Sequence, residues 1–305
     1  MQTCGIVIGI LYLFTGRDSM HTLVFDVYGT LVDAQAVVAM LEGSLGERAE
    51  LFARQWRAKM LEYSYRMGLM RWYKPFSECI RFAFLHTCET YGVTFSSEET
   101  TALVGKYRTL PPYEEAHDAL DAFCQTNATC FAFSNGAQED LESLLQFAGL
   151  RNYFHDVVSV ESIRIYKPSR IAYAYVLERI ARYHQTLATA GDGSAAHASR
   201  AEELRMSERR CLHYVESGLF DAAEAVPERG PVLPVPDLTR VWLISSNPFD
   251  VIGAKVAGLQ AVWIRRSPKE IFDPWGVEPT ITVANLTELY DLLKYKRIIV
   301  PISKT

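Results

Sequence analysis

The stretch LVFDVYGTLVD, residues 23–33, places one ionisable side chain, Asp26, between an apolar run and a Tyr-Gly-Thr turn. Leu23, Val24 and Phe25 show no alternation of polar and apolar residues, so they predict a short strand buried on both faces of a parallel sheet. Asp26 then lies at the carboxyl end of this strand, where ligands bind in open α/β sheets. The alternative is that Asp26 caps the helix that follows.

The composition is that of a globular protein with a large core. The chain has 305 residues, of which 49% are hydrophobic and 22% charged, and its formal net charge is -5. An acidic balance without a basic stripe argues against a nucleic-acid partner. The six cysteines form no CxxC pair and no zinc-like spacing, which favours reduced thiols and a cytoplasmic location.

The first twenty residues contain one apolar run, from Cys4 to Phe14. This run is too short to span a bilayer, so no stable membrane insertion is expected. Residues 1–20 are interpreted as an N-terminal extension that the fold does not require. The hydrophobic region of a signal peptide and a weak membrane anchor are the alternatives.

Alternating strand and helix patterns predict an α/β fold with a doubly wound parallel sheet. The core is expected to comprise residues 21–33 and 111–305. Within it, residues 128–136 and 154–163 predict strands, residues 140–149 and 166–181 predict helices, and residues 240–266 predict a final β-α-β unit. Apolar residues at intervals of three and four over residues 34–110 predict a small helical cap domain inserted after the first strand.

Residues 183–240 do not fit this plan, because they are roughly fifty residues longer than a direct helix-to-strand connection requires. Residues 188–203 are small and polar, and residues 225–240 are rich in proline and glycine. The segment is interpreted as a polar insertion within the core, with a helix near residues 207–223.

Polar side chains follow four of the predicted strands. Each has a structural explanation on its own, because Asn-Gly is a turn dipeptide and Ser or Asn often begins a helix. Carboxyl ends of parallel strands meet at one edge of a sheet, so together these residues predict a site there. They are Asp26 and Thr30; Ser134 and Asn135; Lys167; and Ser245, Asn247 and Asp250.

The order D-x-x-G-T, S-N-G, K-P and S-S-N-x-x-D resembles the haloacid dehalogenase superfamily and, within it, the type II L-2-haloacid dehalogenases. The likeness covers most of residues 21–180 and 240–275. It is most specific at FDVYGTLVD (25–33), QWRAKMLEYSYRMGLM (55–70), SNG (134–136), YKP (166–168) and SSNPFDVIGAKVAG (245–258). The resemblance implies a Rossmann-like core, a helical cap and hydrolysis of short (S)-2-haloacids to (R)-2-hydroxyacids.

The family mechanism gives each matching residue an expected role. Asp26 would attack the carbon that bears the halogen and form an aspartyl ester. The counter-ion of Asp26 and the residues that activate water would be Lys167, Ser245, Asn247 and Asp250. Thr30 and Ser134 would hold the carboxylates of Asp26 and the substrate. The positions that match substrate-binding or halide-binding residues of the family are Tyr28, Arg57, Leu61, Asn135, Tyr173 and Phe249.

The residue types favour dehalogenation over phosphate chemistry. A phosphatase of this superfamily needs a second Asp two residues after the nucleophile to protonate the leaving alkoxide, but Tyr28 stands there, and a halide leaves without a proton. A phosphatase also needs Mg²⁺, which prefers several carboxylate oxygens, whereas residues 244–250 hold Asp250 alone. We therefore expect no cofactor and no metal ligands. A magnesium-dependent phosphatase and a catalytically silent binding protein are the alternatives.

The expected partners are a small 2-halo carboxylate and a second copy of the chain. The homodimer is expected from the family resemblance and from the apolar, aromatic segment RWYKPFSECIRFAFL, residues 71–85. An exposed apolar helix face would be a liability for a monomer.

Overall fold

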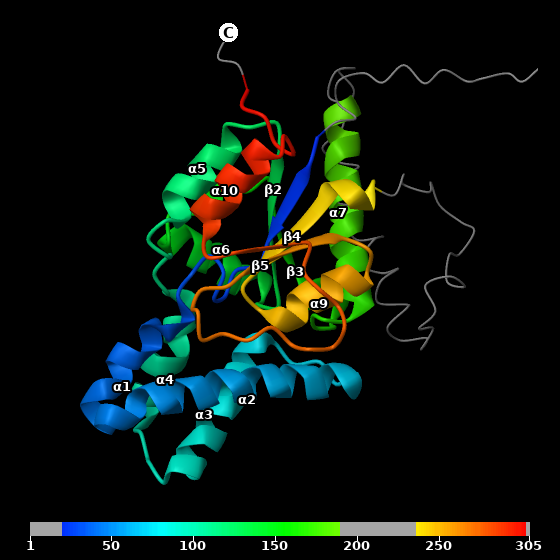
Figure 1. The fold of residues 1–305 in the computed structure, drawn as a ribbon. Coiled ribbons are helices and arrows are strands. Elements are labelled where there is room, and N and C mark those ends of the chain that lie inside the picture. Colours follow the sequence, from blue (N-terminus) through cyan, green and yellow to red (C-terminus); the bar gives the residue numbers. More distant parts are fainter. Residues whose placement is uncertain (1–19, 190–235, 303–305) are drawn as a thin grey trace, which may run out of the picture.

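The computed structural model describes residues 20–189 and 236–302, and Figure 1 draws the remaining residues as a grey trace. Apart from Met20, the predicted N-terminal extension lies outside the described residues. The helix expected near residues 207–223 also lies outside them, together with the rest of residues 190–235.

A parallel sheet of six strands forms the centre of the described part of the chain, with the order β3-β2-β1-β4-β5-β6. Strands β1, β2 and β4 are buried along their whole length, as expected for runs without polar alternation. The predicted doubly wound sheet is therefore confirmed. Its strands are β1 (Thr22–Phe25), β2 (Thr129–Ser134), β3 (Asp156–Ser159), β4 (Val241–Ser245), β5 (Gln260–Ile264) and β6 (Ile281–Val283).

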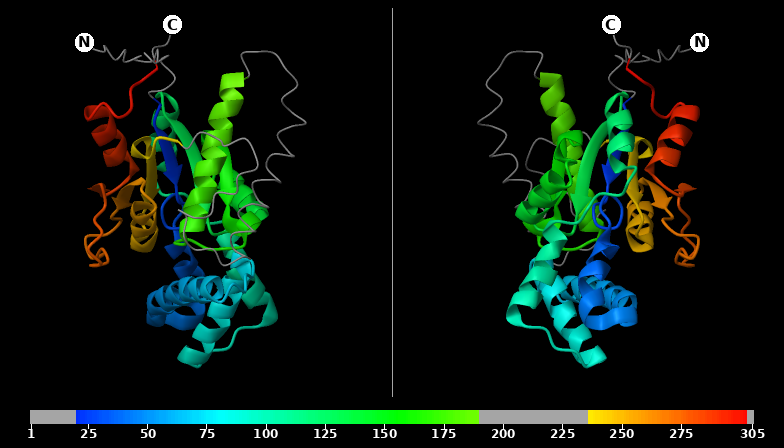
Figure 2. Two further views of the ribbon diagram at one scale, coloured as in Figure 1. Left: turned by 90° about the vertical axis from the view of Figure 1, so that its right-hand side faces the viewer. Right: turned by 90° about the vertical axis from the view of Figure 1, so that its left-hand side faces the viewer.

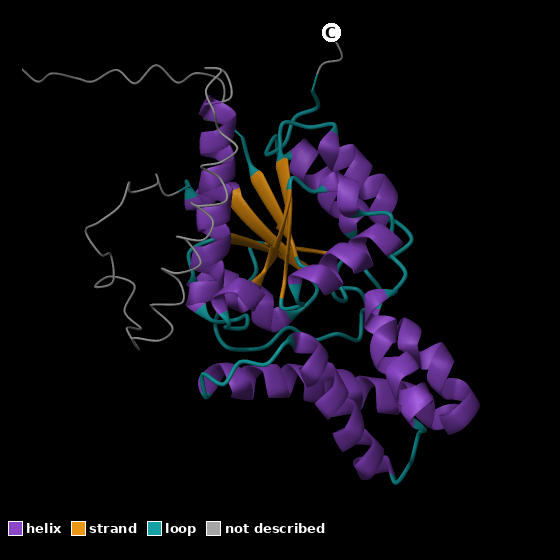
Figure 3. Cartoon of the chain, turned by 180° about the vertical axis from the view of Figure 1, so that it is seen from behind, coloured by secondary structure: helices purple, strands orange, loops and turns teal. Residues whose placement is uncertain are grey.

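Helices cover both faces of the sheet (Figures 1 and 3). One face carries α5 (Ala116–Cys124), α6 (Gln138–Phe147) and α10 (Leu286–Tyr295). The other face carries α7 (Arg170–Thr189) and α9 (Pro248–Val256). Helix α6 ends where the sequence predicts, since Gly149 adopts the left-handed backbone with φ of 70° that glycine tolerates.

Aromatic side chains fix both layers of helices on the central strands. The ring of Phe123 in α5 lies 5.7 Å from Phe25 in β1 and 5.4 Å from Tyr290 in α10. On the opposite face, Phe133 in β2 lies 6.0 Å from Tyr173 in α7. Burial of each large apolar side chain stabilises the fold by about 1.5–3 kcal/mol. The strands that lead to Asp26 and Ser134 are therefore held from both sides.

A second group of helices lies beyond the carboxyl ends of the strands (Figures 1 and 2). Trp56 in α2 holds this group together, because its indole N–H donates to the Ile80 carbonyl at 2.8 Å and its ring lies 4.9 Å from Phe84. We propose that residues 34–110 form a cap domain over the core. The helices of this group are α1 (Val38–Leu45), α2 (Ala49–Leu69), α3 (Phe76–Tyr91) and α4 (Ser97–Gly105), with short 3-10 turns at Ala34–Val37, Gly46–Arg48 and Lys106–Arg108.

The start of the insertion at residue 183 was predicted too early, because helix α7 continues to Thr189. Tyr183 packs on the sheet, with its ring 5.5 Å from Phe131 and 5.1 Å from His155, and this contact carries the helix past residue 183. The sequence analysis also missed β6 and α10, although Asn285 and Glu288 are a typical helix start. The Asn285 side chain accepts from the Glu288 amide at 2.8 Å.

Within residues 20–189 and 236–302, no helix has the length and apolar character needed to cross a membrane. The cysteines in these ranges, Cys79, Cys88, Cys124 and Cys130, are free thiols, in agreement with the sequence analysis.

Candidate active site

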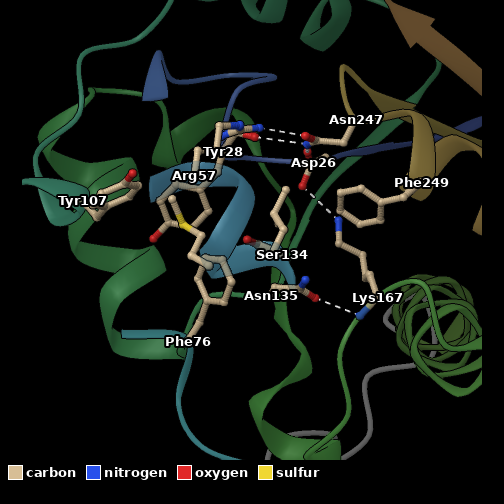
Figure 4. Close-up of a pocket in the computed structure, with 12 residues that line it drawn as sticks. Asp26, Tyr28, Arg57, Phe76, Tyr107, Ser134, Asn135, Lys167, Asn247 and Phe249 are labelled. Atoms are coloured by element: carbon tan, nitrogen blue, oxygen red, sulfur yellow. Dashed lines mark hydrogen bonds and ion pairs between the residues drawn. The ribbon is translucent and has the colours of Figure 1, made fainter. Parts of the chain in front are cut away.

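The carboxyl ends of the strands bring all the candidate site residues together, at the boundary between the sheet and helices α2 and α3 (Figure 4). Most of them line a small cavity: Asp26, Tyr28, Arg57, Leu61, Ser134, Asn135, Lys167, Asn247 and Phe249. The others do not line the cavity: Thr30 and Ser245 donate to Asp26, and Asp250 accepts from Lys167 and Tyr173. Thr30, expected to hold the carboxylates of Asp26 and the substrate, donates to Asp26, and Tyr173, expected at the substrate, donates to Asp250.

The Asp26 carboxylate is almost completely buried and accepts four hydrogen bonds. Its Oδ2 accepts from the Thr30 hydroxyl at 3.0 Å, the Ser245 hydroxyl at 3.1 Å and the Asn247 amide at 2.7 Å. Its Oδ1 accepts from Lys167 Nζ at 2.9 Å. The side chain caps no helix, so the structural alternative for Asp26 is wrong. Since Oδ2 is saturated, Oδ1 is the oxygen that retains a free lone pair.

Lys167 lies between the two buried carboxylates. Its three ammonium protons are all used, because Nζ donates to Asp26 Oδ1 at 2.9 Å, Asp250 Oδ2 at 2.6 Å and the Phe133 carbonyl at 3.1 Å. Burial by itself lowers the pKa of Lys167, but the charges of Asp250 and Asp26 outweigh it and raise the pKa above its ordinary value. The side chain is therefore held as a cation.

The backbone beside Lys167 connects it to a further candidate residue. The Lys167 amide donates to the Asn135 side-chain oxygen at 2.9 Å, so the loops after β2 and β3 are tied together. Asn135 thereby presents its amide group toward the cavity in a fixed orientation (Figure 4).

Asp250 lies at the start of α9 and is fully buried. Burial raises its pKa above the usual range, against the attraction of Lys167. Tyr173 Oη donates to Asp250 Oδ1 at 2.7 Å. A Cβ atom at Gly253 would overlap this hydroxyl and the ring of Pro168, so the close packing of α7 on α9 requires glycine there.

Arg57 extends from helix α2 to the loop after β4 at the carboxyl edge of the sheet. Its Nη2 donates to Asn247 Oδ1 at 2.7 Å, and the same Asn247 donates to Asp26 (Figure 4). Gly29 has a φ of 81°, and a Cβ atom there would approach Arg57 Nη2 to 2.8 Å. Glycine at this position therefore allows the positive φ of the turn and leaves space for the Arg57 guanidinium.

The cavity is small and mainly apolar. It measures about 30 Å³, and Met60, Phe76 and Tyr107 complete its wall. The ring of Tyr28 lies 6.0 Å from Phe76 and 6.2 Å from Tyr107. The sequence analysis missed Met60, Phe76 and Tyr107. Nothing in a helical pattern shows which buried residues of this helical segment also face the sheet.

The described residues contain no group of three or more His, Cys, Asp and Glu side chains placed to hold a metal ion. The groups that face Asp26 are instead an ammonium, two hydroxyls and an amide.

The structure thus combines a doubly wound parallel sheet with a buried carboxylate–lysine–carboxylate network at the carboxyl ends of its strands, where ligands bind in open α/β sheets. The chain belongs to the haloacid dehalogenase-like hydrolase family, whose model matches residues 20–195. The resemblance found in the sequence is thereby confirmed at the level of the family.

Named relatives match most of the chain. It is 26% identical to (S)-2-haloacid dehalogenase 2 of Pseudomonas sp. (strain CBS-3) over 91% of this chain and 97% of that protein. It is 28% identical to haloacetate dehalogenase H-2 of Moraxella sp. (strain B) over 90% of this chain and 98% of that protein.

Solved structures share the fold. The L-2-haloacid dehalogenase of Xanthobacter autotrophicus with chloropropionic acid covalently bound superposes with a TM-score of 0.66 at 24% identity. The match covers 90% of this chain and 98% of that chain.

Proposed function

We propose that the protein hydrolyses the carbon–halogen bond of short (S)-2-haloacids and releases (R)-2-hydroxyacids. The observation that carries this proposal is the Asp26 carboxylate, which faces a cavity of about 30 Å³ walled mainly by apolar and aromatic side chains. The names of the relatives that match nine-tenths of the chain support the same class of substrate.

In the first step, Asp26 Oδ1 attacks the carbon that bears the halogen. An aspartyl ester bond forms, the carbon–halogen bond breaks, and the halide leaves with the bonding electron pair. Attack from the side opposite the halogen inverts the configuration of that carbon. Lys167, Thr30 and Ser245 hold the carboxylate in place, so little reorganisation is needed when it reacts.

In the second step, water attacks the carbonyl carbon of the ester and the hydroxyacid leaves. Asp250 takes one proton from the attacking water and returns it to the oxygen of the leaving hydroxyacid, and its pKa, raised by burial, suits it to this role. The second proton of the water passes to solvent when Asp26 returns to a carboxylate. Lys167, Ser245 and Asn247 position the water. The regenerated Asp26 carboxylate then carries one oxygen atom from the solvent.

The remaining cavity residues bind the substrate. Ser134 and the backbone N–H groups of the turn after β2 hold the substrate carboxylate, and Arg57 and Asn135 receive the halide. Tyr28, Leu61 and Phe249 contact its alkyl group. The hydrogen bond from Arg57 to Asn247 keeps the guanidinium over the cavity before substrate enters.

A halide-release assay tests this function. We expect release of chloride or bromide from L-2-halo acids of two to four carbons and no comparable hydrolysis of a panel of phosphate esters. Full activity is expected after exhaustive treatment with EDTA, because Lys167 already supplies the positive charge beside Asp26 and Asp250. Phosphate-ester hydrolysis that magnesium restores after EDTA would contradict the proposal and favour a phosphatase.

We also propose that the chain forms a homodimer. The aromatic side of α3, including Phe76 and Phe84, is buried and does not supply the expected interface. Leu69, Met70 and Trp72, at the end of α2 and just after it, are 87%, 60% and 57% exposed and support an interface. Light scattering at micromolar concentration is expected to give twice 34.5 kDa, and a single species of 34.5 kDa would overturn this proposal.

A further inference from the structure

Arg266 lies after β5, outside the residues that surround the cavity, and its side chain is only 11% exposed. It contacts both connections between the sheet and helices α1 to α4. The outgoing connection comprises residues 27–33, and the returning connection comprises residues 109–115.

The outgoing connection is held through Thr30. Arg266 Nη2 donates to the Thr30 carbonyl. The hydroxyl of the same Thr30 donates to Asp26 Oδ2 at 3.0 Å and accepts from the Ser246 amide at 2.9 Å. One residue therefore separates the Arg266 guanidinium from the carboxylate of the proposed nucleophile.

The returning connection is held through two residues. Arg266 Nη1 forms an ion pair with Glu115, and the guanidinium carbon lies 3.7 Å from the centre of the Tyr113 ring. Burial alone would raise the pKa of Glu115, but the hydrogen bond and charge of Arg266 lower it, so the ion pair is maintained. Glu115 also accepts from the Leu286 amide at 3.4 Å, which anchors the pair to α10.

The two connections pair with each other beside Arg266. Val32 and Pro112 form an isolated β-bridge. The Asp33 amide donates to the Pro111 carbonyl at 2.9 Å, and the Tyr113 amide donates to the Leu31 carbonyl at 3.0 Å. A side chain that holds both connections therefore restrains the turn that contains Thr30.

We infer that Arg266 is a positioning residue for the nucleophile, because its guanidinium fixes the Thr30 turn against the returning connection and thereby sets the orientation of Asp26. This inference rests on the proposed function for its kinetic consequence. Only a planar guanidinium can donate to a carbonyl and a carboxylate while stacking on a tyrosine ring, so lysine is a poor replacement.

The test compares three variants. Arg266→Ala is expected to lower kcat by about tenfold to a hundredfold, since small displacements of a reacting group have effects of this size, with KM changed by less than about threefold. Arg266→Lys is expected to recover only a small part of kcat. The matched control is Arg265→Ala, whose side chain is exposed and donates to the Glu270 and Pro268 carbonyls, and it is expected to keep wild-type kcat.

Chemical rescue distinguishes a lost positioning role of Arg266 from a general loss of folding. Guanidinium ion is added at concentrations below those that unfold the protein. It is expected to restore part of kcat in Arg266→Ala and none in Arg266→Lys, where no space for the ion is left. Unchanged kcat in Arg266→Ala would overturn the inference. A loss that guanidinium does not rescue, or that Arg265→Ala shares, would overturn it as well.

Hydrogen exchange gives a readout that needs no turnover. The peptides that cover residues 27–33 and 109–115 are expected to exchange faster in Arg266→Ala than in Arg265→Ala, while the peptide that covers β2 is unchanged. If the wild-type protein releases no halide, the proposed function fails. Hydrogen exchange then tests by itself whether Arg266 restrains the two connections. Equal exchange in both variants would overturn the restraint itself.

Discussion

Replacement of Lys167 with methionine is expected to lower dehalogenase activity at least about a thousandfold, the upper part of the range for loss of an acid–base group. The same change leaves Asp26 and Asp250 buried without their shared cation. Breaking a buried ion pair in this way costs about 3–5 kcal/mol of the free energy of unfolding. Halide release and urea denaturation measure the two effects.

The lost stability of Lys167→Met is expected to depend on pH. Burial already raises the pKa of Asp250, and the variant lacks the cation that opposes this. A carboxyl group whose pKa is higher in the folded state binds more protons there, so stability falls as pH rises. The variant is therefore expected to be closer to wild type at about pH 5 than at about pH 8.

Lys255→Met is the matched control for Lys167→Met. Lys255 lies on α9, close to Asp250 in sequence, but its Nζ contacts the exposed Thr280 hydroxyl at 3.0 Å. It is expected to keep wild-type activity and to show no pH-dependent loss of stability. Activity of Lys167→Met within a few fold of the control would contradict the role of Lys167.

Replacement of Asp26 with asparagine is expected to lower activity about ten-thousandfold or more, because an amide oxygen cannot take the place of the attacking carboxylate. The substitution preserves shape, and the hydrogen bonds from Thr30 and Ser245 retain an acceptor. Circular dichroism and thermal unfolding are therefore expected to show a folded protein. Asp33→Asn, at an N-cap away from the cavity, is the control and is expected to stay active.

The sheet and the place where the candidate site residues meet could be predicted because they depend on local patterns. The apolar run from Leu23 to Phe25 is typical of a buried parallel strand, and the sheet topology then places Asp26, Ser134 and Asn247 at the same edge. The cavity wall could not be predicted in this way. Phe76 and Tyr107 follow the same helical spacing as residues in the centre of the cap, and only the docking of the cap on the sheet selects them.

The sequence analysis also fell short where contacts between residues far apart in the sequence determine the structure. Helix α7 extends because Tyr183 packs on Phe131, which lies far from it in the sequence. Arg266 has no motif of its own, since its partners Thr30 and Glu115 come from two separate connections. The helix start at Asn285 was a local signal that sequence reasoning could have used.

Loss of activity in Asp26→Asn fits either a nucleophile or a general base, so an isotope experiment tests the central claim most directly. A single turnover is run in water labelled with heavy oxygen, with enzyme in excess over an L-2-halo acid. If Asp26 forms an ester, the oxygen that enters the first product comes from its own side chain. The hydroxyacid is then expected to be unlabelled, and mass spectrometry is expected to find one heavy oxygen in the peptide that contains Asp26. Labelled hydroxyacid with an unlabelled peptide would show direct attack by water and would contradict the account.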